Sequence, residues 1–244
     1  MKITEKQNML LELITNFHKA CVSLCIKYSL ACGTALGAVR EHGFIPWDDD
    51  IDIMMRYSDY LVMQNSKQTE FKWVCAKNEK KSPVILARVY DKNVDYDHLE
   101  AFPYIDIHVY VGGSDNDAET IRAIKITDFY AKVYWVKSRR YHNILKRKKS
   151  FIGTLCKIPL LVVSKKKCVA TMIKYIDKWD YITAKKIFPL QGYYKEKEIL
   201  PKMWLESYVL LQFCGVELYV ISNYDAYLKQ LYGDYMTPVR YKRT

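Results

Sequence analysis

The spacing of apolar residues predicts a first half in which helices alternate with short strands. Residues 5–29 repeat apolar side chains at steps of three and four, which indicates an amphipathic helix that packs one face on a core. A helical turn fits residues 35–40, and Ser58 is a suitable N-cap for a further helix. Short strands are expected at residues 30–32, 71–76, 84–90 and 104–111.

The last third of the chain predicts a β-hairpin followed by a capped helix. Residues 207–213 and 216–221 are the expected strands, joined by a turn at Gly215. Asn223 is the expected N-cap of the helix, and Gly233 is a suitable residue to end it.

The segment between these two parts is rich in helix formers, cations and aromatic residues. We therefore expect an α+β fold, with a mixed β-sheet core, flanking helices and a basic helical lobe. The expected divisions are residues 1–117 for the core, residues 118–190 for the lobe, and residues 191–244 for a C-terminal hairpin and helix that complete the core.

The net charge of +11 is concentrated in this lobe. Residues 122–186 contain 18 Lys+Arg and 3 Asp+Glu, so this segment carries +15 and the rest of the chain −4. Its densest clusters are residues 146–149 and 165–167, the second directly after an apolar run at residues 158–163. Such basic helices bind anionic lipid headgroups, or they are solvated faces of ordinary core helices. Because no nucleic-acid-binding signature accompanies the charge, no nucleic-acid partner is expected.

Cysteine usage and hydropathy suggest a compartment. The seven cysteines are scattered, odd in number and without a Cys-x-x-Cys pair, which suits free thiols in a reducing compartment and predicts no zinc site. Residues 1–8 carry charge where a secretory signal would need an apolar segment to begin. The apolar run at residues 158–163 is far shorter than the about 20 residues that span a bilayer. We expect a cytoplasmic protein, at most peripheral at the inner face of the membrane.

Residues 31–53 carry the strongest chemical signal. They place four carboxylates within five residues: Asp48, Asp49, Asp50 and Asp52. So much negative charge in a short segment is unfavourable unless a cation neutralises it. In a strand, the alternation of acids with isoleucines directs Asp50 and Asp52 to one face, which makes a pair of oxygen ligands suited to Mg²⁺ or Mn²⁺.

Two other interpretations compete with this metal site. A run of aspartates is often a solvated turn, but apolar residues are interleaved with these acids, and a solvated loop has no need of buried partners. Asp48, Asp50 and Asp52 also match positions one, three and five of an EF-hand calcium loop. However, Ile53 stands at the sixth position, where Gly is needed, and Asp59 stands at the twelfth, where Glu is needed.

Three further features are candidate phosphate-binding or acidic groups of the site. A tight turn at Gly33 and Thr34 would let backbone N–H groups face a phosphate, although such a pair alone is more often a plain helix start. Asp106 lies in a similarly alternating strand and is the candidate third carboxylate, although a lone Asp on a strand is often solvated. Arg88 is a candidate phosphate partner or an edge residue that extends into solvent.

Residues 33–53 resemble the signature of the LicD family. The matching segments are Gly-Thr-Ala-Leu-Gly-Ala-Val-Arg at residues 33–40 and Gly-Phe-Ile-Pro-Trp-Asp-Asp-Asp-Ile-Asp-Ile at residues 43–53. Tyr-Gly-Asp-Tyr-Met at residues 232–236 resembles the family's closing motif. The family includes bacterial phosphocholine transferases and, more distantly, fukutin-type transferases. The resemblance therefore implies a nucleotidyltransferase-like fold with residues 1–117 as its catalytic core.

The resemblance also implies an activity. Such an enzyme moves a phospho-alcohol, foremost phosphocholine, from CDP-choline or another CDP-alcohol and releases CMP. The implied acceptor is a hydroxyl of a surface glycan, such as lipopolysaccharide or teichoic acid, or of its lipid-linked precursor. Asp50, Asp52 and Asp106 match the family's catalytic and metal-binding acids, and Asp106 alternatively accepts the proton of the attacking hydroxyl.

Other residues are implied in substrate binding. The candidate donor-binding residues are Gly33, Thr34, Arg40, Trp47, Asp48 and Asp49. Arg40 would pair with phosphate oxygens bidentately, while Asp48 and Asp49 would orient the loop or the metal shell. A choline group calls for an aromatic cage, for which Trp47, Trp204 and Tyr232 are candidates.

The chain departs from the family pattern at three places near the substrate pockets. Met stands at residues 54 and 55 where relatives carry small residues, His-Val-Tyr at residues 108–110 replaces Phe-Pro-Leu, and Ile-Ser at residues 221–222 replaces Val-Pro.

Two other functions stay open: transfer of a nucleoside monophosphate to a small molecule or RNA, and an inactive glycan-binding module. The head group stays open as well, because phosphocholine, phosphoethanolamine, an aminoalkylphosphonate, glycerol phosphate and ribitol phosphate share this chemistry.

Overall fold

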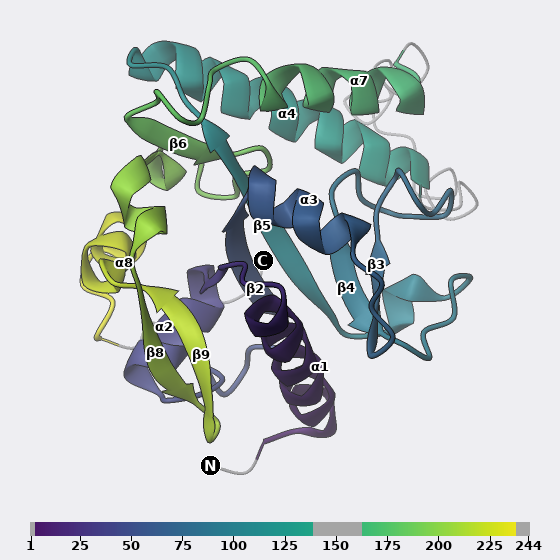
Figure 1. The fold of residues 1–244 in the computed structure, drawn as a ribbon, viewed down its shortest axis with the longest axis vertical. Coiled ribbons are helices and arrows are strands. Elements are labelled where there is room, and N and C mark those ends of the chain that lie inside the picture. The colour runs from purple at the N-terminus through teal and green to yellow at the C-terminus, as the bar shows by residue number, and fades with distance from the viewer. Residues whose placement is uncertain (1–2, 139–162, 238–244) are drawn as a thin grey trace, which may run out of the picture.

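The computed structural model describes residues 3–138 and 163–237, which form an α+β fold around a mixed sheet of seven strands (Figure 1). The predicted fold class is confirmed. The basic cluster at residues 146–149 and most of the apolar run at residues 158–163 lie outside the described residues.

Helices, strands and short 3₁₀ helices alternate along the chain. The helices are α1 (Glu5–Ser23), α2 (Cys32–Arg40), α3 (Tyr57–Asn65), α4 (Asp117–Ser138), α7 (Lys165–Ile176) and α8 (Tyr224–Tyr232). The strands are β1 (Ser29–Leu30), β2 (Ile51–Arg56), β3 (Phe71–Val74), β4 (Arg88–Asp91), β5 (Tyr104–Gly112), β6 (Lys186–Pro189), β7 (Leu200–Pro201), β8 (Tyr208–Phe213) and β9 (Val216–Ile221). Short 3₁₀ helices in the connections are η1 (Leu99–Ala101), η2 (Lys195–Glu198) and η3 (Lys202–Glu206).

Strand β5 is the centre of the large sheet. It pairs in parallel with β2 and antiparallel with β4 and β6, within the order β1-β2-β5-β4-β3. The parallel pair places Asp52 directly opposite Asp106. Strands β8 and β9 form a separate hairpin, which is tied to β1 because the Ile221 N–H donates to Ser29 Oγ at 2.9 Å. The last third of the chain is thereby held against the strand that leads into α2.

Helix α1 is amphipathic, as predicted, but shorter. Its buried face includes Phe17, whose ring centroid lies 5.4 Å from that of Tyr28 and 5.7 Å from that of Phe71. The helix ends at Ser23, because the backbone of Cys25 just beyond it is left-handed (φ 54) and cannot continue a right-handed helix. Figure 1 shows α1 and α3 in front of the sheet.

Helices α4 and α7 are the described helical part of the basic lobe. They lie side by side along one edge of the molecule (Figure 1). The chain then returns to the large sheet, because β6 pairs with β5. Within residues 3–138 and 163–237, no helix is long and apolar enough to cross a membrane.

The start of α2 differs from the prediction. The expected strand at residues 30–32 ends at Leu30, and the helix begins at Cys32 rather than at residue 35. Gly33 and Thr34 therefore lie in the first turn of a helix and not in a turn before it. The two glycines of α2, at positions 33 and 37, do not prevent a helix when burial of its other residues compensates, and most of α2 is buried.

Two other boundaries also differ from the prediction. Helix α3 begins at Tyr57 with Arg56 as its N-cap, so the prediction that Ser58 caps it is wrong. Strand β4 begins only at Arg88. Residues 84–87 are buried but do not belong to a strand. A short apolar run indicates burial, but its pattern alone does not distinguish a strand from another buried segment.

The C-terminal prediction is confirmed. Strands β8 and β9 lie within one residue of their expected ranges, and α8 follows with Asn223 at its N-cap. The Asn223 side chain makes no capping hydrogen bond, however. Gly233 ends the helix with φ +74, a backbone conformation that favours glycine.

Replacing Gly37 by Ala is expected to destabilise the fold by about 1–3 kcal/mol. An added Cβ would overlap the carbonyl oxygen of Gly43 and lie 3.3 Å from the Ile45 nitrogen, so backbone has to move. Urea denaturation measures the loss. Gly113→Ala is the matched control, since the nearest atoms to its added Cβ are 3.3 Å away. Equal losses in both variants would contradict this steric account.

Candidate active site

Two acids lie side by side on the central strands. Asp52 on β2 and Asp106 on β5 are paired in register, and their side chains are 23% and 35% exposed. The isoleucines on either side of each acid are buried. The predicted alternation is therefore confirmed at both strands: apolar neighbours face one way and the acids share the other face. Asp50 lies just before β2 begins, so the prediction that it shares a strand with Asp52 is wrong.

The first turn of α2 holds the backbone of Asp52. The Asp52 N–H donates to Thr34 Oγ1 at 2.9 Å, and the Ala31 N–H donates to the Asp52 carbonyl at 2.9 Å. Thr34 is only 3% exposed, so no solvent competes strongly for this bond. The Gly33-Thr34 pair and Asp52 are thus brought together, with Thr34 acting through its side chain on the acidic strand.

The acidic loop, residues 48–50, crowds against the same helix start. A Cβ on Gly33 would lie 2.9 Å from Asp48 Oδ2, so the glycine leaves room for this carboxylate. Burial, together with the charges of Asp52 and Asp48, raises the pKa of Asp50 to about 7. Burial likewise raises the pKa of Asp48. These crowded carboxylate oxygens fit a divalent cation such as Mg²⁺, which would neutralise them.

Helix α1 anchors this loop from the other side. The Gln7 side chain, which is buried, donates from Nε2 to the Asp48 carbonyl at 2.9 Å. Lys6 Nζ lies 2.9 Å from Asp49 Oδ2 in an exposed ion pair. Asp49 therefore pairs with α1, while one carboxylate oxygen each of Asp48, Asp49 and Asp50 lies within 4.8 Å of the others.

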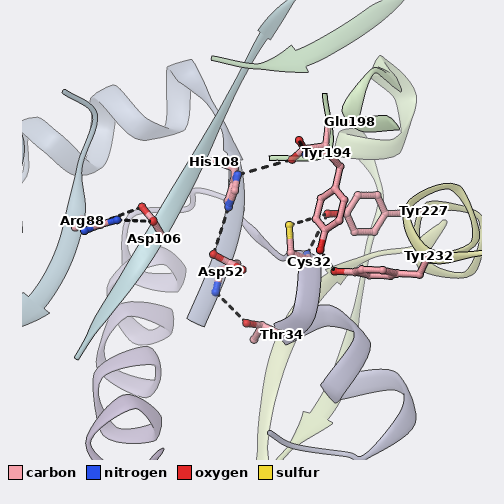
Figure 2. A network of polar contacts seen from close by, with 10 residues as sticks. All are labelled: Cys32, Thr34, Asp52, Arg88, Asp106, His108, Tyr194, Glu198, Tyr227 and Tyr232. Atoms are coloured by element: carbon pink, nitrogen blue, oxygen red, sulfur yellow. Dashed lines mark hydrogen bonds and ion pairs between the residues drawn. The ribbon is translucent and has the colours of Figure 1, made fainter. Parts of the chain in front are cut away.

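Arg88 on β4 holds the carboxylate of Asp106. Its Nη2 and Nε lie 3.0 and 3.3 Å from the two carboxylate oxygens (Figure 2). Its guanidinium also stacks 3.9 Å from the ring centroid of Tyr104. Burial lowers the pKa of Arg88, but the charge of Asp106 raises it by more. The side chain is only 16% exposed. Arg88 thus points along the sheet and does not extend into solvent.

His108 connects Asp52 with a buried acid that the sequence did not indicate. Its Nε2 lies 3.3 Å from Asp52 Oδ1, and its Nδ1 lies 3.9 Å from Glu198 Oε1 (Figure 2). Burial lowers the pKa of His108, but the hydrogen bond and charge of Asp52, together with the charges of Glu198 and Asp106, raise it to about 9. Glu198 is 0% exposed; its Oε2 accepts from the Tyr194 N–H at 2.6 Å, while Oε1 accepts no hydrogen bond within the described residues.

Tyrosines from the last third of the chain close this side of the site. Tyr227 of α8 accepts at Oη from the Cys32 N–H at 3.1 Å. Tyr194 donates from Oη to Tyr232 Oη at 3.1 Å. Figure 2 shows these rings grouped around Cys32, opposite Asp52 and His108. Residues that follow the lobe are therefore part of the same polar cluster as the acidic strands.

A cavity of about 530 Å³ opens beside Asp106. Its lining combines cationic, acidic and aromatic side chains. Among them are Arg88, Tyr104, Asp106, His108, Trp135 and Tyr193. The site therefore has a pocket of the size that small ligands occupy.

Some predicted residues lie elsewhere. Arg40 stands at the far end of α2 from Thr34, where its guanidinium donates to Glu41 Oε1 at 2.8 Å and to the Tyr235 carbonyl at 2.9 Å. The structure thus does not bring Arg40 to the acids. Of the three suggested cage aromatics, Tyr232 belongs to the polar cluster, while Trp47 is 45% exposed and Trp204 lies in η3.

The sequence of the chain matches a known class of nucleotidyltransferase-type domains. A family described as "LicD/FKTN/FKRP, nucleotidyltransferase domain" matches residues 25–167, more than half of the chain. The chain is therefore a member of the LicD family, and the predicted family is confirmed.

Individual relatives extend this comparison. The chain is 28% identical over 254 residues to the lipopolysaccharide cholinephosphotransferase LicD of Haemophilus influenzae, which covers 97% of this chain and 92% of that protein. It is also 28% identical over 180 residues to an uncharacterized protein of Rickettsia prowazekii, covering 62% of this chain and 67% of that protein. The similarity to the Haemophilus enzyme thus includes the segments that supply His108, Glu198 and Tyr232.

Proposed function

We propose that this protein transfers phosphocholine from a CDP-linked donor to a hydroxyl of a cell-surface glycan or of its lipid-linked precursor, and releases CMP. The observation that carries the proposal is the paired Asp52 and Asp106 beside the first turn of α2. The similarity to a lipopolysaccharide cholinephosphotransferase over nearly the whole chain supports the choice of phosphocholine and of a glycan acceptor.

Mg²⁺ or Mn²⁺ would be held by Asp50 and Asp52, with Asp48 beside them and Asp106 as a further candidate. When bound, the ion neutralises charge on the donor pyrophosphate. The first turn of α2 has backbone N–H groups without helical partners, and those of Gly33 and Thr34 would bind donor phosphate oxygens. In place of Arg40, Arg88 is the arginine close enough to Asp106 to contact the donor.

The reaction forms one P–O bond and breaks another. The acceptor hydroxyl oxygen attacks the phosphorus that carries choline, and the bond from that phosphorus to the bridging oxygen breaks, so that CMP leaves with the bridging oxygen. The hydroxyl proton passes to Asp106, unless this carboxylate instead shares the metal. Arg88 fixes both Asp106 oxygens, so the proton-accepting oxygen would have a defined direction.

The cavity beside Asp106 suits the organic part of the donor. Tyr104 and Trp135 offer aromatic faces, and Arg88 offers a cation for phosphate oxygens. Aromatic faces bind both a nucleobase and a quaternary ammonium group. Both parts of CDP-choline are therefore candidates for this cavity.

One reaction mixture tests the proposal. The protein is incubated with CDP-choline, Mg²⁺ and a lipid-linked or free glycan, and both CMP release and the mass of the acceptor are measured. We expect an acceptor heavier by phosphocholine and no turnover when a chelator removes the metal. An acceptor that instead carries CMP would support nucleotide transfer. If the protein neither bound nor turned over any CDP-alcohol, that result would support an inactive binding module.

A panel of CDP-alcohols identifies the head group. Thermal shifts are measured with donors that carry choline, ethanolamine, glycerol or ribitol, because a ligand that binds only the folded state stabilises it. We expect the largest shift with CDP-choline. A larger shift with another donor would replace phosphocholine while leaving the reaction class in place.

We also propose that the basic lobe contacts anionic membrane surfaces. On α7, Lys166 and Lys167 are exposed and Ile173 is 52% exposed, and on the neighbouring α4 Phe129 is 44% exposed. Cations around exposed apolar side chains suit a surface of acidic lipids. The lipid-linked glycan precursors of the proposed reaction would lie at such a surface.

Co-sedimentation with phosphatidylglycerol vesicles is expected to be strong at low salt and weak at high salt, because salt screens the attraction. Lys166→Glu with Lys167→Glu should weaken binding about tenfold or more, since each basic residue near the surface contributes about 1 kcal/mol. Lys77→Glu with Lys80→Glu, on the connection between β3 and β4, makes the same charge change elsewhere and should have little effect. Equal losses in both double variants would refute a lobe-specific contact.

A further inference from the structure

We propose that Cys32, His108 and Glu198 form a buried binding site for a transition metal ion such as Zn²⁺, separate from the Mg²⁺ site of the acidic loop. Three elements supply the ligands: the start of α2, strand β5 and η2. Sulfur, imidazole nitrogen and carboxylate oxygen are the ligand types that Zn²⁺ takes in proteins. The proposal does not depend on the reaction proposed above.

The distances fit a shared ion better than a direct contact. One ligand atom of each of the three side chains lies within 4.8 Å of the others. His108 Nδ1 and Glu198 Oε1 are 3.9 Å apart, which is too long for a hydrogen bond. Two bonds of about 2.0–2.1 Å from these atoms to one ion span that gap, and Cys32 would complete the set with a bond of about 2.3 Å. Only small side-chain movements are needed.

Burial gives a second, independent indication. Glu198 is 0% exposed, and its Oε1, the atom that faces His108, accepts no hydrogen bond within the described residues. A buried carboxylate oxygen without a partner is costly. A bound cation would satisfy it. Cys32 is 5% exposed, so a metal there would be well shielded from water.

The neighbours of the three residues hold them in place for this role. With its proton on Nε2, His108 donates to Asp52 Oδ1 and leaves Nδ1 available as a ligand, which is the carboxylate–histidine–metal arrangement common in zinc proteins. The backbone of Cys32 is left-handed (φ 46), and its N–H is fixed by the Tyr227 hydroxyl. The Tyr194 N–H fixes the other oxygen of Glu198.

This site differs in chemistry from the acidic loop. Asp48 and Asp50 offer only oxygen ligands, which suit Mg²⁺, whereas a thiolate and an imidazole select zinc and similar ions. Three protein ligands leave a fourth position for water or another oxygen. The sequence predicted no zinc site because it has no Cys-x-x-Cys pair, and the three residues here are far apart along the chain.

Metal binding by the purified full-length protein tests the proposal. After removal of metals with a chelator, Co²⁺ is added and the absorption spectrum is recorded, followed by Zn²⁺ competition. We expect one Co²⁺ per chain, a thiolate-to-cobalt charge-transfer band and visible bands of tetrahedral geometry, all displaced by Zn²⁺ but not by excess Mg²⁺. Cys32→Ala should remove the charge-transfer band, whereas Cys168→Ala, which removes a buried thiol on α7, should leave it.

Glu198→Gln provides a second variant that keeps the size of the side chain. It should weaken Zn²⁺ affinity by at least about tenfold, with thermal melts confirming that it folds. Absence of the sulfur band in the wild-type protein, or its persistence in Cys32→Ala, would overturn the proposal. In that case His108 pairs with the two carboxylates as a protonated imidazolium. Because none of these measurements uses turnover, a protein inactive with CDP-choline would still test this site.

Discussion

Replacing Asp52 by Asn is expected to lower turnover with CDP-choline by about 10³-fold, because a catalytic metal contributes several kcal/mol and each 1.36 kcal/mol is a factor of ten. The variant keeps the shape of the side chain and both backbone hydrogen bonds of Asp52, to Thr34 and Ala31. It removes the charge that would hold the ion. Steady-state CMP release measures the effect, and Mn²⁺ binding followed by electron paramagnetic resonance tests its cause.

The control is Asp97→Asn, which removes one exposed carboxylate that pairs with Lys81. Surface ion pairs contribute only about 0–1 kcal/mol, so activity and Mn²⁺ affinity should stay near those of the wild type. Retained turnover in Asp52→Asn would remove the metal-holding role from this residue. Lost turnover with unchanged Mn²⁺ affinity would assign Asp52 another role in the reaction.

The acidic part of the site could be predicted from sequence because its signal is local. The alternation around Asp52 and around Asp106 needs only the period of a strand, and the structure confirms it at both places. What no local pattern contains is the pairing of the two strands. β2 and β5 are separated by α3, β3 and β4, and only the sheet order brings their acids together.

Glu198 could not be recognised in the same way. It lies in a run of alternating Lys and Glu at residues 195–198, which is typical of a solvated surface, yet it is 0% exposed. Its environment comes from β5 and from the Tyr194 backbone, not from its own segment. His108 left a weak signal, since a histidine stands where the family carries Phe. The signal did not identify its two acidic partners.

Two arginines show that residues of one motif need not share one site. Arg40 belongs to the same family-like segment, residues 33–40, as Gly33 and Thr34, and was expected to bind the same donor phosphates. Because those residues belong to one helix, the six steps from Thr34 to Arg40 amount to about 9 Å along its axis. Arg88 is distant in sequence, but the antiparallel β4–β5 pairing places it directly opposite Asp106.

Replacing Thr34 by Val is expected to lower turnover by about 10²-fold, because small displacements of a catalytic group carry a cost of that size. Valine has nearly the same shape but no oxygen, so the Asp52 N–H would lose its acceptor at a position where Thr34 is 3% exposed. An unsatisfied buried donor costs about 1–3 kcal/mol, and urea denaturation should show a loss of that order.

Thr34→Ser separates the hydroxyl from the methyl group of this side chain. Serine keeps the oxygen that accepts from the Asp52 N–H, so most of the activity should return even though a buried methyl group is lost. If Thr34→Val and Thr34→Ser lost activity equally, packing around α2 and not this hydrogen bond would hold Asp52. If only Thr34→Val were impaired, the first turn of α2 would position the acidic strand as well as bind phosphate. The helix start and the acids would then act as one unit.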